Sequence, residues 1–176
     1  MDYQQAFNDL FPQFFENEGI RAMPADHFCV ELAMPLAGEL PPAPECAPGY
    51  RFDWYRGDPE RLCRAVAQVA EDWVQYFTPE NRVLCAFDGE EIASFCIVDD
   101  FGQSQGRKIG GPGCVGTVPA YRKQGVGLRL VWEATRLLKE MAYDVSWIHY
   151  THLDRWYGKL GYETVLKWNA GGFLPL

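Results

Sequence analysis

Three features are scarce or missing in this 176-residue sequence, and each absence excludes a class of protein. No run of apolar residues approaches the length that a membrane helix requires, so we expect no membrane span. Basic residues number 16 against 24 acidic ones, and the net charge of −8 argues against a nucleic-acid or anionic-membrane partner. Residues 1–7 lack the basic start and apolar run of a signal peptide, which favours a cytoplasmic location.

The sequence also has no C-x-x-C pair, although it contains six cysteines. Several of them stand in apolar, strand-like runs, where a reduced thiol behaves as a small hydrophobic side chain. We therefore expect core thiols rather than disulfides or metal ligands. The six are Cys29, Cys46, Cys63, Cys85, Cys96 and Cys114.

The length and a hydrophobic content of 48% indicate one globular domain. A proline-rich stretch precedes residue 49, and a regular pattern of apolar runs follows it. We expect residues 1–48 to be an N-terminal extension packed on the core, and residues 49–176 to be the domain itself. Trp147 and Trp168 are expected in its core.

Periodicity and turn signals predict the order of the elements. Strands are expected at residues 27–34, 50–55, 83–87, 92–98, 114–118, 145–150 and 162–168, and helices at residues 7–15, 59–78, 125–141 and 153–160. Asp88-Gly89 indicates a hairpin, and residues 99–112 are expected to form a loop. This order predicts an α/β (α+β) fold with a mixed, mostly antiparallel sheet of six to seven strands and helices on both faces.

The segment from Val118 to Arg129 ends an apolar strand, turns through two glycines and opens a long amphipathic helix. The first N–H groups of a helix have no intrahelical partner, and they coincide with the positive end of its dipole. Gly125 and Gly127 allow close approach of the backbone to an anion, so the segment predicts a phosphate site. It matches neither the dinucleotide fingerprint nor the P-loop. Mobile positive charge is expected from Arg122, Lys123 and Arg129.

Two motifs in this order resemble those of the GNAT N-acetyltransferase superfamily. Arg122, Gly125 and Gly127 match its Gln/Arg-x-x-Gly-x-Gly/Ala turn, and residues 156–162 (WYGKLGY) resemble its later motif, aromatic-Tyr-x-Lys-x-Gly-Phe/Tyr. The resemblance covers residues 50–168 and implies a GNAT-type fold, acetyl-CoA as acyl donor, and a small-molecule or peptide amine as acceptor. One departure is Tyr150, where the family often carries an asparagine that contacts pantetheine.

The resemblance also implies roles for single residues. The pyrophosphate would lie on the N–H groups of residues 123–128, pantetheine would pair with the backbone of residues 116–118, and the Val118 N–H would polarise the thioester carbonyl. Tyr157 would act as general acid toward the leaving thiolate, the alternative being a buried tyrosine bonded to the backbone. The implied cofactor-binding residues are Gly116, Thr117, Val118, Arg122, Lys123, Gln124, Gly125, Val126, Gly127 and Leu128.

A base is also needed, because an alkyl amine has a pKa of about 10 and is charged at neutral pH. The candidates are His149, His152, Asp99, Asp100 and, more weakly, Glu31. Polar residues at strand ends are ordinary, so the sequence does not choose among them. A non-catalytic acyl-CoA-binding or regulatory module is the alternative function. The acceptor, the acyl chain and a homodimeric state are left open.

Overall fold

A computed structural model gives the positions of residues 1–176, which form a mixed α/β fold. Eight strands occur in the hydrogen-bonded order β2-β3-β4-β5-β6-β1-β7-β8. β5 and β6 pair in parallel, whereas β1 pairs antiparallel with both β6 and β7. The strands are β1 (Cys29–Pro35), β2 (Tyr50–Trp54), β3 (Val83–Asp88), β4 (Glu91–Ser104), β5 (Arg107–Thr117), β6 (Val145–Thr151), β7 (Glu163–Asn169) and β8 (Gly172–Leu174).

Five α-helices and three 3₁₀-helices accompany these strands. The α-helices are α1 (Tyr3–Leu10), α2 (Glu18–Arg21), α3 (Pro59–Ala67), α4 (Val126–Glu140) and α5 (Asp154–Gly158). The 3₁₀-helices are η1 (Phe14–Glu16), η2 (Glu71–Tyr76) and η3 (Pro119–Tyr121). None of these helices combines the length and the apolar character needed to cross a bilayer.

The chain divides into two compact units. The first contains Met1–Glu39, Asp100–Gly111 and Met141–Leu176, and the second contains Leu40–Asp99 and Pro112–Glu140. The first unit joins segments that are far apart in the sequence, because β1 pairs with β6 and β7. The division of the chain at residue 48 stays a prediction.

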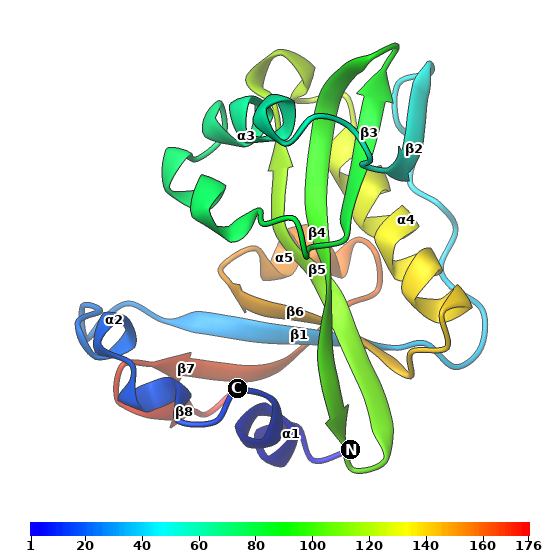
Figure 1. The fold of residues 1–176 in the computed structure, drawn as a ribbon. Coiled ribbons are helices and arrows are strands. Elements are labelled where there is room, and N and C mark those ends of the chain that lie inside the picture. Colours follow the sequence, from blue (N-terminus) through cyan, green and yellow to red (C-terminus); the bar gives the residue numbers. More distant parts are fainter. The chain divides into compact units, whose positions relative to one another are not determined.

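In the second unit, helices cover both faces of the strands (Figure 1). Leu62 of α3 belongs to a buried cluster with Val83 and Cys85, which are alternate residues of β3. Leu84, which lies between them, is equally buried, and α4 contacts the same strand. Because successive side chains of a strand point to opposite faces, β3 is covered on both sides.

In the first unit, aromatic side chains of the N-terminal segment pack against the sheet. Phe7 of α1 has no exposed surface and shares a cluster with Trp147 of β6 and Leu166 of β7. The tip of the β4–β5 hairpin holds this helix, since the Ser104 hydroxyl donates to the Asp9 carboxylate at 2.6 Å. The N-terminal segment is therefore part of the packed core of this unit.

The expected loop over residues 99–112 is wrong. β4 continues to Ser104 and β5 begins at Arg107, so a long hairpin turns at Gln105 and Gly106. Their φ angles are 51° and 71°, and a two-residue turn with two positive φ angles matches the twist of paired strands. The two strands of this hairpin could not be predicted, because their polar residues show no alternation of apolar and polar side chains.

Other expected elements are confirmed with changed limits. The helix from residue 59 ends at Ala67 instead of Thr78, and Tyr76, expected on its buried face, is 53% exposed. The Asp88-Gly89 signal does mark the β3–β4 hairpin. The sheet has eight strands rather than six or seven, since the short β8 gives no clear apolar pattern.

Candidate functional site

The turn between β5 and α4 lies in the second unit and presents backbone donors. The first hydrogen bond of α4 runs from the N–H of Arg129 to the carbonyl of Gly125 at 3.1 Å. The N–H groups of Val126, Gly127 and Leu128 precede that bond, so they have no carbonyl partner within the helix. Together with the positive end of the helix dipole, they form a place where an anion is stabilised.

The geometry of this turn requires glycine at position 125. Gly125 has a φ of +79°, and a Cβ there would lie 2.5 Å from the carbonyl oxygen of Glu45. The neighbouring Gln124 accepts twice, from the N–H of Ala47 at 2.9 Å and from the hydroxyl of Tyr50 at 2.6 Å. These contacts fix the backbone of the turn before any ligand binds.

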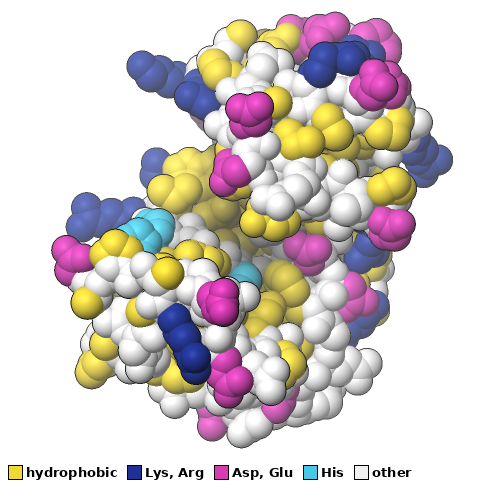
Figure 2. Space-filling view, turned by 60° about the vertical axis from the view of Figure 1, so that its left-hand side comes forward, with side chains coloured by type: hydrophobic (Ala, Val, Ile, Leu, Met, Phe, Trp, Pro, Cys, Tyr) yellow, Lys and Arg dark blue, Asp and Glu magenta, His cyan; other side chains and the backbone are white.

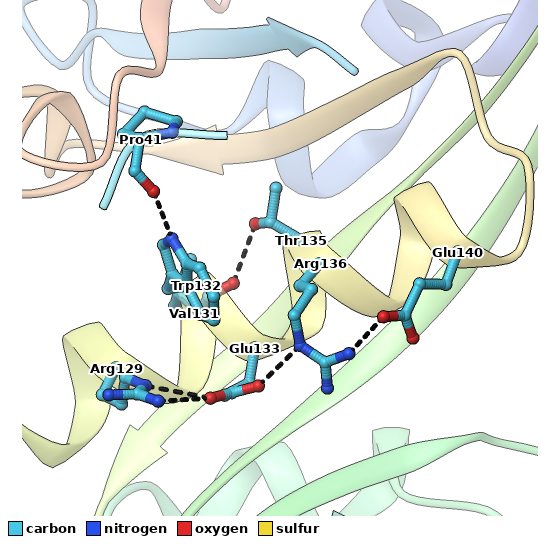
Figure 3. A network of polar contacts seen from close by, with 8 residues as sticks. All are labelled: Pro41, Arg129, Val131, Trp132, Glu133, Thr135, Arg136 and Glu140. Atoms are coloured by element: carbon cyan, nitrogen blue, oxygen red, sulfur yellow. Dashed lines mark hydrogen bonds and ion pairs between the residues drawn. The ribbon is translucent and has the colours of Figure 1, made fainter. Parts of the chain in front are cut away.

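Positive charge at the turn comes from two exposed side chains, Arg122 and Lys123. Arg129, by contrast, is paired with the Glu133 carboxylate at 2.9 Å (Figure 3). The Glu133 side chain is only 11% exposed, and it also binds Arg136 at 2.9 Å. The expectation that Arg129 supplies mobile charge is therefore wrong, because a largely buried carboxylate holds its guanidinium.

At the end of β5, the backbone edge that faces β4 is already hydrogen-bonded within the unit. The N–H of Val118 donates to the carbonyl of Ala93 in β4 at 3.0 Å. The expected oxyanion role of the Val118 N–H is therefore wrong, because the neighbouring strand occupies this donor. Successive residues of a strand direct their backbone groups to opposite edges, so Thr117 faces away from β4. Its carbonyl accepts from Nε of Arg122 at 3.2 Å.

Gly116 is likewise engaged inside the unit. Its carbonyl accepts from the hydroxyl of the buried Ser94 at 2.7 Å. A Cβ at this position would lie 2.3 Å from the Phe95 ring, so the strand cannot carry a larger residue here. Of the three residues expected to pair with pantetheine, Thr117 is thus the one whose backbone faces outward.

A pocket of about 300 Å³ opens beside Val118 in the same unit. The Arg61 guanidinium at its wall lies 3.2 Å from the Glu91 carboxylate, so part of its charge is compensated. The lining residues come from α3, the start of β4 and the segment after β5, and they are Arg61, Arg64, Ala65, Gln68, Glu91, Ile92, Val118, Ala120 and Tyr121.

The first unit buries a carboxylate among four donors. Glu31, in the middle of β1, has no exposed surface. Its Oε2 accepts from Nε1 of Trp147 at 2.6 Å and lies 2.9 Å from Nδ1 of His149. Its Oε1 accepts from Nε1 of Trp168 at 2.7 Å and from the N–H of Tyr150 at 3.1 Å. An ionised carboxylate only accepts hydrogen bonds, so this set of donors fits the charged form.

A bulge in β6 creates this arrangement. The flanking pairs are Val30↔Thr151 and Leu32↔Ile148. Over this stretch β6 therefore has one residue more than β1, at His149 and Tyr150, and Tyr150 has a φ of +55°. A bulge changes the regular alternation of side chains and backbone groups. Here it lets both the His149 ring and the Tyr150 N–H reach Glu31.

Aromatic rings hold the imidazole of His149 on its other sides. Phe11 stacks on it with a centroid distance of 4.0 Å and an interplanar angle of 11°. Phe14 meets it edge-on at 5.3 Å, and the His149 side chain remains 22% exposed. Because the carboxylate accepts, we assign the proton to Nδ1, which leaves the lone pair of the neutral ring on Nε2. That atom can take a proton from a substrate.

Two of the other candidate bases have different partners. His152 lies beside Cys29, with 3.7 Å between Nε2 and Sγ. Asp100 of β4 is exposed, and its carboxylate accepts from the N–H of Gly102 in the same strand at 3.0 Å. Of the five candidate bases, His149 and Glu31 are the two that the structure brings into contact.

Tyr157 lies on α5 in the first unit and is 6% exposed. Its ring packs against Trp156 and Tyr162, at centroid distances of 4.8 and 6.1 Å. Its role as general acid stays a prediction.

The indole donors around Glu31 were not anticipated. Trp147 and Trp168 are buried in the core as expected, and their N–H groups bind the carboxylate. The signal in the sequence is a glutamate inside an apolar strand, because a buried charge requires donors and a buried indole N–H requires an acceptor.

Comparisons with known proteins agree with this fold. Similar solved structures include a glucosamine N-acetyltransferase region of a fungal multi-domain GH3 β-N-acetylglucosaminidase, with 18% identity, a TM-score of 0.69, and coverage of 81% of this chain and 20% of that one. A GCN5-related N-acetyltransferase from Kribbella flavida has 22% identity, a TM-score of 0.58, and coverage of 79% and 55%. One from Sphaerobacter thermophilus has 18% identity, a TM-score of 0.60, and coverage of 80% and 49%.

At these identities the likeness shows the fold alone, and the chain spans about half or less of those chains. No curated protein matches the sequence. The model of the Acetyltransferase (GNAT) family matches residues 45–162, which include the turn before α4 and the motif around Tyr157. The resemblance inferred from the two motifs is thereby confirmed, and the chain belongs to the GNAT acetyltransferase family.

Proposed function

We propose that this chain is an acyl-CoA-dependent N-acyltransferase that transfers an acetyl group from acetyl-CoA to a primary amine, by direct transfer in a ternary complex. The observation that carries the catalytic part is the contact between His149 and the buried carboxylate of Glu31. A module that only binds acyl-CoA has no need of an oriented imidazole beside a buried charge.

The turn before α4 fits the pyrophosphate of this donor. The N–H groups of Val126, Gly127 and Leu128 precede the first helical hydrogen bond, and Gly125 leaves the backbone uncovered by a side chain. The exposed Lys123 adds a positive charge that can move to the phosphates. The outward backbone edge of β5 would pair with pantetheine.

His149 would act as the general base. Its Nε2 takes the proton of the attacking amine while Nδ1–H stays bonded to Glu31, so the charge formed on the imidazole meets a buried anion. The amine nitrogen bonds to the thioester carbonyl carbon, and the C–S bond breaks. The leaving thiolate takes a proton from Tyr157, which regains one from water, and the imidazolium of His149 releases its proton to water.

The test measures acetyl-CoA binding and turnover separately. We expect titrated acetyl-CoA to raise the melting temperature by mass action, and an amine panel analysed by mass spectrometry to contain an acetylated product. Tyr157→Phe and His149→Gln should keep binding and lower kcat by about 100-fold or more. Tyr76→Phe, at an exposed tyrosine of η2, is the matched control. Unchanged turnover in either variant would remove that residue from the mechanism.

One observation favours a second candidate, a non-catalytic acyl-CoA-binding module. The N–H of Val118, expected to stabilise the oxyanion, already donates to Ala93. Binding of acetyl-CoA without release of free coenzyme A, across a broad panel of amines, would support this second function and overturn the first.

A further inference from the structure

Three side chains with metal-binding atoms converge in the first unit, at the ends of β1 and β6. His27 precedes β1, Cys29 begins it, and His152 follows β6. Their ligand atoms all lie within 4.8 Å of one another. The strand register explains the meeting, because the pairing Val30↔Thr151 places the preceding and following residues side by side.

We propose that His27, Cys29 and His152 form a binding site for Zn²⁺. Zn²⁺ binds sulfur at about 2.3 Å and imidazole nitrogen at about 2.0–2.1 Å, so tetrahedral ligand atoms lie about 3.3–3.6 Å apart. The distance of 3.7 Å between Sγ of Cys29 and Nε2 of His152 is already close to this range. The ligand atom of the exposed His27 lies within 4.8 Å of the other two, so a side-chain rotation would complete the set.

The ligand types select the metal. One thiolate with two imidazoles favours a borderline or soft ion such as Zn²⁺ over Mg²⁺ or Ca²⁺, which prefer oxygen. The two imidazoles are accessible, since a pocket of about 600 Å³ is lined by His27, His152, Asp26 and Asp154, among others, whereas the Cys29 thiol has no exposed surface. On the face drawn in Figure 2, histidine side chains (cyan) reach the surface beside basic and hydrophobic ones.

Three protein ligands leave one coordination position for water or for a carboxylate. Asp26 and Asp154 line the same pocket, so an aspartate can occupy that position or bind the coordinated water. Binding replaces the S–H bond of Cys29 by an S–Zn bond and releases the thiol proton to water. Because binding releases the thiol proton, the affinity for Zn²⁺ should increase with pH.

The bound ion would join the start of β1 to the end of β6. These strands carry Glu31 and His149, two residues after Cys29 and three before His152 respectively. The Zn²⁺ site does not depend on the proposed function, because an ion bound to both strand ends would stabilise the first unit whatever reaction the protein catalyses.

The experiment uses the full chain, treated with a chelator and dialysed, then titrated with ZnCl₂ by calorimetry and with CoCl₂ by absorption. We expect one Zn²⁺ per chain, a raised melting temperature, and a thiolate-to-cobalt charge-transfer band. His27→Ala and His152→Ala, at exposed positions, should each weaken Zn²⁺ binding by about tenfold or more without loss of fold. Cys29→Ala should abolish the cobalt band.

Cys63→Ser, at a thiol of α3 in the second unit, is the matched control and should bind Zn²⁺ like the unmodified chain. If Cys29→Ala does not fold, the two histidine variants still decide the question. The proposal is overturned if the folded chain binds no stoichiometric Zn²⁺, if both histidine variants bind it equally well, or if the cobalt complex lacks the thiolate band.

Discussion

Nδ1 of His149 lies 2.9 Å from Oε2 of Glu31, whose carboxylate has no exposed surface. Two indole N–H groups and one backbone N–H complete the set of donors around that carboxylate. If the imidazole turned away, a buried charge would lose a donor, at a cost of about 1–3 kcal/mol. The imidazole is therefore held in one orientation, as a base in acyl transfer requires.

The first prediction concerns this pair. Glu31→Gln keeps the shape of the side chain but places an NH₂ group against donors, so we expect the free energy of unfolding to fall by about 1–3 kcal/mol. We also expect kcat to fall by about 100-fold with an unchanged KM for acetyl-CoA, because the imidazole loses its orienting anion. Steady-state kinetics over a range of pH and urea unfolding provide the measurements.

Glu163→Gln, at an exposed carboxylate of β7, is the control for this change of charge and should behave like the unmodified chain. A folded Glu31→Gln variant with the kcat and the pH profile of the unmodified chain would contradict the positioning role of Glu31.

The second prediction concerns the turn before α4. Gly125→Ala combines a positive φ with a Cβ 2.5 Å from the Glu45 carbonyl, so the free energy of unfolding should fall by about 2–4 kcal/mol. Gly89→Ala is the matched control, because its φ is +55° and no atom lies within 4 Å of the added Cβ. It should cost only about 1–2 kcal/mol. If urea unfolding showed equal losses of unfolding free energy in the two variants, the close contact between the added Cβ and the Glu45 carbonyl would not contribute to the loss.

The third prediction concerns the ion pairs along α4 (Figure 3). Glu133→Ala leaves Arg129 and Arg136 without their shared, largely buried carboxylate, and we expect a loss of about 1–2 kcal/mol in the free energy of unfolding. The value is moderate because both guanidinium groups keep partial access to water. Glu140→Ala, at the exposed end of the same network, should change stability by less than about 0.5 kcal/mol. Chemical denaturation of both variants measures the difference, and equal effects would contradict the special role of Glu133.

The fourth prediction concerns alkaline pH. Burial raises the pKa of the Cys85 thiol from 9.0 to about 12, so the unfolded chain loses this proton at lower pH than the folded one. Stability from this group is complete below pH 9.0 and declines as the pH rises toward about 12. Cys85→Val should make this decline in unfolding free energy shallower. Cys63→Ser should leave the decline unchanged, and a decline of equal steepness in Cys85→Val would exclude this thiol as a cause.

Much of the second unit could be predicted from local sequence. The glycines at positions 125 and 127 and the helix after them follow from rules about turns and helix ends, and the structure places them as expected. The Asp88-Gly89 hairpin is equally local. By contrast, the hairpin at Gln105 and Gly106 was missed, since its polar strands carry no apolar alternation.

Contacts between residues far apart in the sequence could not be predicted in the same way. Glu31 and His149 were both candidates, yet their meeting depends on the pairing of β1 with β6 and on a bulge in β6. Likewise, the occupied N–H of Val118 follows from its neighbour in β4. Cys29 is buried as expected for a core thiol, but the same register places it beside His152.

The sequence by itself determined the family, the glycine turn before α4 and the candidate residues for proton transfer, because these depend on residue type and short spacing. Only the tertiary structure decided which of those residues are in contact. Strand register and burial join residues more than a hundred positions apart, as Glu31 and His149 are, and neither is encoded in a local pattern. The tertiary structure also decided which charged groups already have a partner. The Arg129 guanidinium, for example, is paired with the nearly buried carboxylate of Glu133.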